Sequence, residues 1–197
     1  SLYDLLAKAA QQFQTWLKSH PHSDASKTYL KNRGLSGEIA QQFGLGFAPD
    51  GWDNLLSLYP SEQHRFLLEA GMVITKDKGG YYDRFRNRIM FPIRDRRGRY
   101  IAFGGRVLDD GTPKYQNSPE TPVFKKGHEL YGLYEILQQG RHPEKLLVVE
   151  GYMDVIALAQ YGINCAVATL GTAITNHHID RLLKVTKHVI FCFDGDN

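Results

Sequence analysis

Cysteine is scarce in this sequence, with only Cys165 and Cys192 among 197 residues. Each lies within an apolar run, so we expect two buried structural thiols. Two cysteines cannot build a disulfide-rich scaffold or a four-cysteine zinc site. The neighbouring His177 and His178 also lack zinc-binding spacing, and we expect both at the surface. Such sparing use of cysteine is typical of a protein of the reducing cytoplasm.

Long hydrophobic runs are missing as well. No run approaches the roughly 18 residues of a membrane-spanning helix. The N-terminal residues lack the basic, apolar and small-residue order of a signal peptide, and we find no repeat or low-complexity segment. The hydrophobic content of 42% is ordinary for a globular protein. We therefore expect one large domain or two small ones, and a monomeric protein with no membrane partner.

Positive charge is unevenly distributed along the chain, although the net charge is only +3. Residues 76–126 contain 13 lysines and arginines against six acidic residues. Residues 144–197 contain four basic and six acidic residues. A solvated surface would explain the charge counts alone, but a basic tract beside an acidic one also suits a metal-dependent enzyme that binds a polyanion.

The first two thirds of the chain mix helical and strand patterns. Apolar spacing, caps and breakers predict helices at Leu2–His20, Ser23–Asn32, Ser36–Phe43, Trp52–Leu58, Glu62–Ala70 and Glu129–Gln138. Short apolar runs between turn residues predict strands at Leu45–Ala48, Met72–Thr75, Gly79–Tyr82, Ile89–Ile93 and Tyr100–Phe103. These patterns predict an α+β subdomain, which is basic in composition.

The last third alternates strands and helices. Apolar runs at Leu146–Val149, Ile163–Ala168 and Val189–Phe193 predict strands buried on both faces, separated by helices at Tyr152–Tyr161 and Asn176–Thr186. This order predicts a parallel sheet with flanking helices, so the fold class is α/β. Gly140 and Pro143 suggest a boundary between residues 1–143 and 144–197.

Carboxylates follow two of the predicted parallel strands. Glu150 ends the first, and Asp194 and Asp196 end the last, so all three should meet where ligands bind such sheets. Asp154, one helical turn after Glu150, could join them or simply favour the start of its helix. Hard oxygen ligands without nearby cysteine or histidine favour Mg²⁺ or Mn²⁺.

The basic tract carries candidate anion-binding residues. Arg84, Arg86 and Arg88 alternate with other residues, which on a strand would place three guanidinium groups on one face, suited to a phosphodiester backbone. A predicted loop at Gly104-Gly105 allows close backbone approach and precedes Arg106. The long segment 109–126 is predicted to be a loop of the kind that often has a function.

Several long motifs carry a family resemblance. EGYMD and FDGD, with the upstream MFPIRDRRGR, FGGRV, PKYQNSPET and FKKGHELYGL, resemble the RNA polymerase domain of bacterial DnaG-type primases, in which the acidic motifs belong to a Toprim fold. The resemblance implies a DNA-dependent RNA polymerase that makes short RNA primers by metal-dependent nucleotidyl transfer. It implies catalytic and metal-binding roles for Glu150, Asp194 and Asp196, with Asp154 as a further metal ligand.

The resemblance also assigns the basic residues. It places nucleic acid or nucleotides beside Arg33, Arg84, Arg86, Arg88, Arg106, Lys114, Tyr115, Asn117 and Lys126. Arg33 could instead interact with a helix C-terminus, and Tyr115 could pack its loop onto the core rather than stack on a base. Without the resemblance, the residues of segment 109–126 would be interpreted as ordinary surface.

Partners follow from the same resemblance. It implies a single-stranded DNA template, ribonucleoside triphosphates, and a replicative helicase and single-strand-binding protein contacted through regions outside these 197 residues, at a bacterial replication fork in the cytoplasm. Zinc is expected only in a preceding module. We expect residues 1–197 alone to bind nucleic acid but to make primers poorly. The alternatives are another Toprim-type metal-dependent nucleic-acid enzyme, a phosphotransferase using Asp194 as nucleophile, and a non-catalytic module that binds single-stranded DNA.

Overall fold

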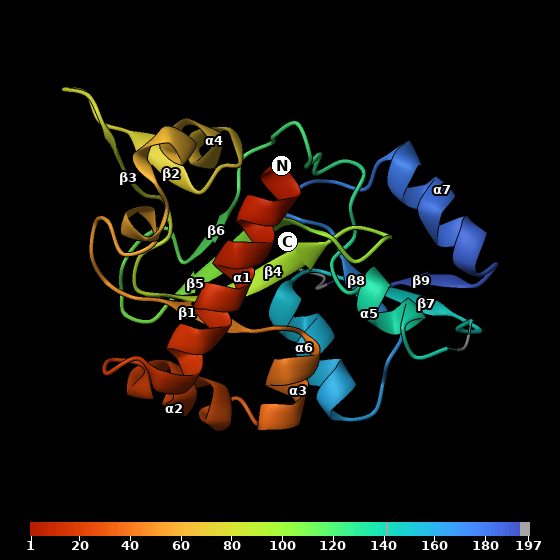
Figure 1. Cartoon of the computed structure of the whole chain (residues 1–197). Helices are drawn as coiled ribbons and strands as arrows, with labels where there is room; N and C mark the ends of the chain where they lie inside the picture. Colours follow the sequence, from red (N-terminus) through yellow and green to blue (C-terminus); the bar gives the residue numbers. More distant parts are fainter. Residues whose placement is uncertain (141, 194–197) are drawn as a thin grey trace.

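The computed structural model describes residues 1–140 and 142–193 (Figure 1). Its helices are α1 Leu2–Ser19, α2 Asp24–Asn32, α3 Gly37–Gln42, the 3₁₀ turns η1 Leu56–Leu58 and η2 Ser61–Gln63, α4 His64–Glu69, α5 Leu133–Leu137, α6 Tyr152–Gln160 and α7 Asn176–Val185. Its strands are β1 Gly46–Ala48, β2 Val73–Thr75, β3 Tyr81–Asp83, β4 Arg88–Arg94, β5 Tyr100–Val107, β6 Tyr115–Asn117, β7 Leu146–Val149, β8 Ala166–Ala168 and β9 Val189–Phe191.

An antiparallel sheet forms the centre of the N-terminal part, with strand order β1-β4-β5-β6. Helix α1 lies across it (Figure 1), and Phe13 meets Phe103 of β5 edge-on, with ring centroids 5.2 Å apart. The three predicted N-terminal helices and the β2–β3 hairpin are confirmed to within two residues at most ends. Ser36 caps α3 as predicted, because its Oγ accepts the backbone N–H of Ile39.

The second sheet is parallel, with strand order β8-β7-β9 and with α6 and α7 as its connections. The predicted alternation of strand and helix is therefore confirmed. Leu146 and Val148 of the central strand are fully buried, as expected for a strand covered on both faces. Across residues 1–140 and 142–193, no helix has the length and apolar character to cross a membrane.

Tyr152, the first residue of α6, joins the two sheets. Its ring stacks on Phe91 of β4, with centroids 5.2 Å apart and planes within 12°, and Tyr131 meets it edge-on at 4.9 Å. Gly104 of β5 leaves room for this ring, since a Cβ at that position would lie 2.4 Å from Cζ of Tyr152. Tyr131 also forms a two-bond backbone bridge with Ala168 at the end of β8. The residue two positions after Glu150 is therefore packed directly against the N-terminal sheet.

Two predicted helices are shorter in the structure because some of their backbone groups form hydrogen bonds with residues far away in the sequence. Instead of a helix over Trp52–Leu58 there is one 3₁₀ turn, and the carboxylate of Asp83 accepts the N–H groups of Leu55 and Leu56. The helix predicted at Glu129–Gln138 begins only at Leu133. Its first part is diverted by the bridge to β8 and by Gly132, which has a φ of +89°.

The arginine-rich stretch is not a strand throughout, so the prediction of three guanidinium groups on one strand face was wrong. Strand β4 begins only at Arg88, and Asn87 before it has a φ of +51°, which interrupts the extended chain. Gly104 and Gly105 lie inside β5 rather than in a loop. Part of the predicted loop 109–126 pairs with β5 as strand β6.

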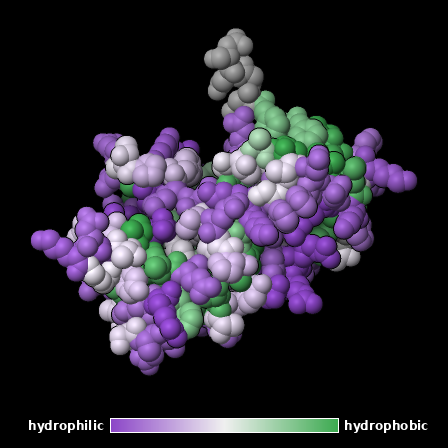
Figure 2. All heavy atoms as spheres, turned by 90° about the horizontal axis from the view of Figure 1, so that it is seen from above, coloured by the Kyte–Doolittle hydropathy of each residue, from purple (hydrophilic) through white to green (hydrophobic). Residues whose placement is uncertain are grey.

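Three burial predictions were also wrong. His178 is fully buried, and backbone partners at both ring nitrogens offset the cost of burying them. His177 is exposed, as predicted. Cys192 is exposed and Cys165 only partly buried. Strand β9 is an edge strand of the described sheet, and its Ile190 and Phe191 are about 45% exposed (44% and 46%). Figure 2 shows the apolar surface that gathers there.

Glu135 on α5 is an acid with only 7% of its surface exposed. Burial raises the pKa of its carboxyl group from 4.5 to about 7, although its own backbone N–H and Arg94 oppose the shift. Because the folded-state pKa is the higher one, stabilisation by this group is complete below pH 4.5 and is lost as the pH rises through about 7.

We therefore expect Glu135→Gln to raise the free energy of unfolding by about 2–3 kcal/mol at about pH 8 and to change it little near pH 4.5. Urea unfolding at both pH values measures the difference. Glu62→Gln, at an exposed position of η2, is the matched control and should have no pH-dependent effect. An equal stabilisation by Glu135→Gln at both pH values would contradict the buried-acid explanation.

Candidate functional site

Glu150 lies where β7 ends, at the rim of a crevice of about 470 Å³. The other lining residues are Phe193 and the segment between β8 and α7, represented by Thr169, Gly171, Thr172, Ala173 and Ile174. The segment after β8 therefore forms most of the crevice wall. The carboxylate of Glu150 is exposed to solvent, so a charged ligand in the crevice can reach it.

The other predicted acidic residues are placed differently. Asp154 lies on the first turn of α6, where its Oδ2 accepts the backbone N–H of Gly151 at 3.2 Å. It thus acts as the helix-capping carboxylate that the sequence also allowed. Asp194 and Asp196 lie outside the described residues. Within residues 1–140 and 142–193, no three acidic, histidine or cysteine side chains form a group that could hold a metal ion.

Arg86 belongs to a partly exposed cluster of Trp52, Tyr82 and Arg86, here called the Trp52 cluster. The guanidinium carbon lies 4.4 Å from the ring centroid of Trp52 and 5.4 Å from that of Tyr82, and its Nη1 donates to the carbonyl of Asp83. Trp52 is 62% exposed although it is a large apolar residue. Sequence reasoning missed Trp52, because a lone tryptophan after a Pro-Asp-Gly turn carries no periodic signal.

Arg88 and Arg106 lie on neighbouring strands of the antiparallel sheet, β4 and β5. Arg88 pairs with Val107, the neighbour of Arg106, and its Nη1 lies 3.3 Å from the carbonyl oxygens of Gly105 and Lys114. Burial, followed by the positive charge of Arg86, lowers the pKa of Arg88, and Arg106 adds to that effect. The positive charges of Arg86 and Arg106 thus repel that of Arg88, and an anion bound beside these arginines would relieve the repulsion.

Arg106 is stacked between tyrosines. Its guanidinium carbon lies 5.1 Å from the ring centroid of Tyr29 and 5.6 Å from that of Tyr115. The guanidinium carbon of Arg33 also lies 5.1 Å from the ring centroid of Tyr29. The side chain of Arg106 is 9% exposed, and its Nε has no hydrogen-bond partner in the described part of the chain. Tyr115 is 44% exposed beside the exposed Lys114, so both can meet a ligand from solvent.

Asn117 connects the basic residues to the Glu150 crevice. Its Nδ2 lies next to Gly171 of the crevice wall, at 2.9 Å from where a Cβ of that glycine would be. Its Oδ1 is buried without a hydrogen-bond partner among the described residues. Since buried polar atoms are usually paired, this amide is suited to bind a ligand at the mouth of the crevice.

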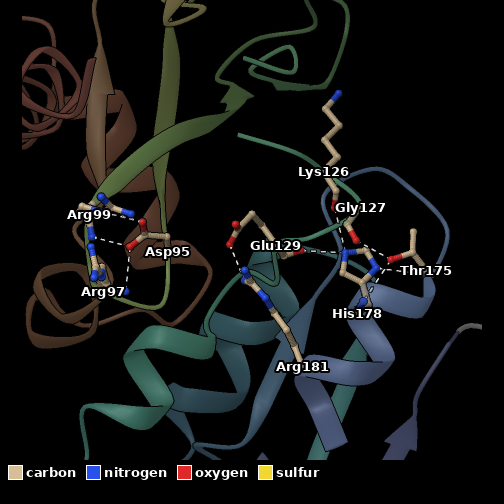
Figure 3. A network of polar contacts seen from close by, with 9 residues as sticks. All are labelled: Asp95, Arg97, Arg99, Lys126, Gly127, Glu129, Thr175, His178 and Arg181. Atoms are coloured by element: carbon tan, nitrogen blue, oxygen red, sulfur yellow. Dashed lines mark hydrogen bonds and ion pairs between the residues drawn. The ribbon is translucent and has the colours of Figure 1, made fainter. Parts of the chain in front are cut away.

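The remaining predicted residues, Lys126, Arg33 and Arg84, differ in how free their side chains are to meet a ligand. Lys126 lies on the segment beside the N-terminus of α7, and its side chain points away from the protein contacts around it (Figure 3). Arg33 ends α2 and is exposed, which leaves both of its predicted roles open. Arg84 instead donates from Nε to the carbonyl of Gly71 at 2.8 Å, and burial lowers its pKa, so its side chain is engaged in holding the β2–β3 hairpin.

Family comparisons agree with these features. Residues 12–137 match the family described as DNA primase catalytic core, N-terminal domain. The chain belongs to the DNA primase catalytic core family. Residues 144–197 match the Toprim domain, so the parallel sheet of this primase core is a Toprim sheet. The α/β fold class and the family resemblance of the sequence are both confirmed.

Individual relatives give the same result. The chain is 61% identical to the DNA primase of Pseudomonas aeruginosa over 99% of its own length and 58% identical to that of Legionella pneumophila over all of it. It spans about a third of these relatives, 30% and 34% respectively.

Solved structures of primase cores share the fold. A DNA primase domain from Pseudomonas aeruginosa superposes with a TM-score of 0.96 at 60% identity, and the chain covers 62% of it. The Escherichia coli primase catalytic core gives a TM-score of 0.96 at 54% identity, with 63% covered. A DnaG primase catalytic domain bound to single-stranded DNA gives 0.95 at 54% identity, with 62% covered. All three cover the whole of this chain.

Proposed function

We propose that this primase core takes part in DNA-directed RNA primer synthesis, by metal-dependent nucleotidyl transfer on a single-stranded DNA template. The observation that carries the proposal is the adjacency of two features: the antiparallel sheet that bears Arg88, Arg106 and Asn117, and the Glu150 crevice, whose wall at Gly171 lies next to Asn117. It combines an anion-binding surface with a carboxylate at the carboxyl end of a parallel strand. A module that only binds DNA has no need of that carboxylate.

The donor chemistry at this edge fits a hard divalent cation. Glu150 offers an exposed carboxylate there, and the other donors that we propose are Asp194 and Asp196, with Asp154 as a further ligand. Carboxylate oxygens without cysteine or histidine favour Mg²⁺ or Mn²⁺. When bound, such a cation supplies charge stabilisation to the phosphate oxygens of a nucleotide. We also propose Glu150 as a general base toward an attacking hydroxyl group.

Template binding is proposed for the basic and aromatic residues. The stacked Arg86 and Trp52 suit a phosphate and a base of the same strand, because aromatic faces stack on any base and arginine binds phosphate. Arg33, Arg88, Arg106, Lys114, Tyr115, Asn117 and Lys126 would continue this surface toward the nucleotide, and Arg84 would support it from the hairpin. The single-stranded DNA in the related DnaG complex favours this assignment.

The remaining proposals concern the whole protein. We propose residues 1–143 as the basic N-terminal subdomain and 144–197 as the Toprim part. Ribonucleoside triphosphates are the proposed second substrate. Contacts with a replicative helicase and a single-strand-binding protein are proposed for regions outside this chain, in the bacterial cytoplasm at the replication fork. These proposals rest on the family to which the chain belongs.

Binding of a fluorescein-labelled single-stranded DNA oligomer, followed by anisotropy at increasing salt, tests the template surface. We expect the logarithm of the affinity to fall linearly with the logarithm of the salt concentration. Arg86→Ala and Lys126→Ala should each weaken binding and make that slope shallower by about 0.7, the value per phosphate contact on a single strand.

Two further variants separate charge from stacking. Lys184→Ala removes an exposed lysine of α7 outside the proposed surface and should change neither affinity nor slope. Trp52→Ala should lower the affinity by roughly five- to 100-fold at unchanged slope, because it removes base stacking but no charge. No binding at low salt, or an equal effect of all three charge variants, would rule out the proposed surface.

A further inference from the structure

A single buried histidine connects the segment 126–129 to the start of α7 (Figure 3). The backbone N–H of Thr175 donates to Nδ1 of His178 at 3.1 Å. Nε2 of the same ring lies 2.9 Å from the carbonyl oxygen of Lys126 and 3.0 Å from that of Glu129. Because a backbone N–H can only donate and a carbonyl oxygen can only accept, the ring is neutral and carries its hydrogen on Nε2.

Two other contacts join the same pieces of chain. The hydroxyl group of Thr175 donates to the carbonyl of Gly127 at 2.5 Å, and Nη1 of Arg181 lies 2.9 Å from Oε2 of Glu129. The Arg181 and Glu129 side chains are only 24% and 11% exposed, so solvent screens this ion pair weakly. We call these six residues the clamp: Lys126, Gly127, Glu129, Thr175, His178 and Arg181.

The clamp fixes the backbone of Lys126 relative to the Glu150 crevice. The N–H of Lys126 donates to Oε1 of Glu120 at 3.2 Å, and its carbonyl group accepts from His178, so both of its backbone groups are bonded. Its side chain extends away from the clamp (Figure 3). On the other side, Thr175 directly follows Ile174, which lines the crevice.

We infer that His178 is a positioning residue: its Nε2–H group holds the backbone of Lys126 so that the ammonium group meets a nucleic-acid phosphate beside the Glu150 crevice. The inference rests on the proposed function, in which Lys126 binds nucleic acid. The simpler explanation is that His178 only caps α7 through Nδ1, a role that does not involve Lys126.

The surroundings keep the ring neutral. Burial lowers the pKa of His178, the carbonyl groups of Lys126 and Glu129 oppose the shift, and the positive Arg181 and His177 add to it. The charged or titratable residues around the ring are Lys126, His128 and Glu129 of one packed segment and His177 and Arg181 of the other. Uncharged amide side chains are therefore suitable replacements for this histidine.

Glutamine and asparagine can separate the two roles of the ring. The glutamine amide reaches the place of Nε2, so His178→Gln retains a donor to the carbonyl groups of Lys126 and Glu129 and loses the cap. The shorter asparagine amide reaches the place of Nδ1, so His178→Asn retains the cap and loses that donor. The positioning role predicts that only His178→Asn releases Lys126, whereas a pure capping role predicts the opposite order.

The first measurement needs no DNA. In the 197-residue chain, hydrogen exchange of the peptide covering residues 124–130 should become about tenfold faster in His178→Asn, the usual effect of losing one net hydrogen bond. In His178→Gln it should stay within about threefold of the wild type. A peptide from β4 and β5 serves as internal control. Unchanged exchange in His178→Asn overturns the inference.

The second measurement links the clamp to DNA binding. Lys126→Ala is introduced into the wild type and into both His178 variants, and the affinity for the labelled oligomer is compared. We expect Lys126→Ala to lower the affinity about three- to tenfold in the wild type and in His178→Gln, but to add nothing in His178→Asn. An equal loss in all three backgrounds overturns the positioning role. If Lys126→Ala has no effect in the wild type while exchange increases in His178→Asn, the proposed function of Lys126 fails and the clamp stands.

A spectroscopic test uses the wild-type chain and does not depend on the stability of any variant. Long-range ¹H–¹⁵N NMR spectra of the histidine rings distinguish the two neutral tautomers and the charged ring. The clamp requires His178 to carry its hydrogen on Nε2 at neutral pH. A hydrogen on Nδ1 would overturn the inference, since Nε2 could then not donate to either carbonyl group.

Discussion

Glu150→Gln is expected to lower templated RNA synthesis by about 10³-fold while leaving the affinity for single-stranded DNA within about twofold of the wild type. The substitution keeps the size and shape of the side chain and removes its negative charge. Glu150 is exposed at the crevice rim and is not among the residues that we propose for template binding. Catalysis and template binding should therefore separate in this variant.

The measurement needs a polypeptide that makes primers efficiently. Residues 1–197 can replace the matching segment of the Pseudomonas aeruginosa DNA primase, which is 61% identical to them. Incorporation of labelled ribonucleotides is then compared between this chimera, its Glu150→Gln form and its Asp180→Asn form. Asp180 is an exposed acid of α7 outside the crevice lining and serves as the control. Full activity of the Glu150→Gln chimera would favour a role in DNA binding alone.

Gly104→Ala is expected to destabilise the protein by at least about 3 kcal/mol, at the upper end of the range for overpacked cores. A Cβ at this position would lie 2.4 to 2.6 Å from Cζ, Cε2 and the hydroxyl oxygen of Tyr152. That ring cannot move aside cheaply, because it is stacked on Phe91 and meets Tyr131 edge-on. Urea unfolding of the 197-residue chain measures the change.

Two further variants show whether the Tyr152 ring is the cause. Gly37→Ala adds a methyl group with nothing within 4 Å, on a helix where alanine is favoured, and should be neutral or slightly stabilising. In a Tyr152→Leu background, Gly104→Ala should cost about 1 kcal/mol or less, since the smaller side chain leaves room. An unchanged unfolding midpoint in Gly104→Ala would show that the two sheets separate more easily than their contacts indicate.

Elements with a strong local pattern could be predicted from the sequence. The amphipathic spacing of α1, the cap at Ser36 and the alternation of apolar runs and helices after Leu146 all identified elements that the structure contains. The errors lie where distant residues take over local hydrogen bonds. Asp83 binds the N–H groups of Leu55 and Leu56, and Ala168 pairs with Tyr131, and no local pattern contains either partner.

The candidate site was predictable in its residue types but not in its contacts. Glu150 was predicted at a strand end and lies there, whereas Asp154 is occupied as a helix cap. The stacking of Arg86 on Trp52 joins positions 34 residues apart, and the burial of His178 depends on carbonyl groups about 50 residues before it. Such pairings arise from tertiary packing, which a period along the chain does not contain. The roles of the individual site residues remain predictions.

The bridge between Tyr131 and Ala168 has a consequence for association between chains. An exposed strand edge offers unpaired N–H and C=O groups to which a strand from another molecule can add. At the outer edge of β8 the N–H and C=O of Ala168 are bonded to Tyr131, at 3.1 and 2.8 Å. The segment before α5 thus covers the C-terminal end of this edge, so we expect strand addition at β8 to be disfavoured.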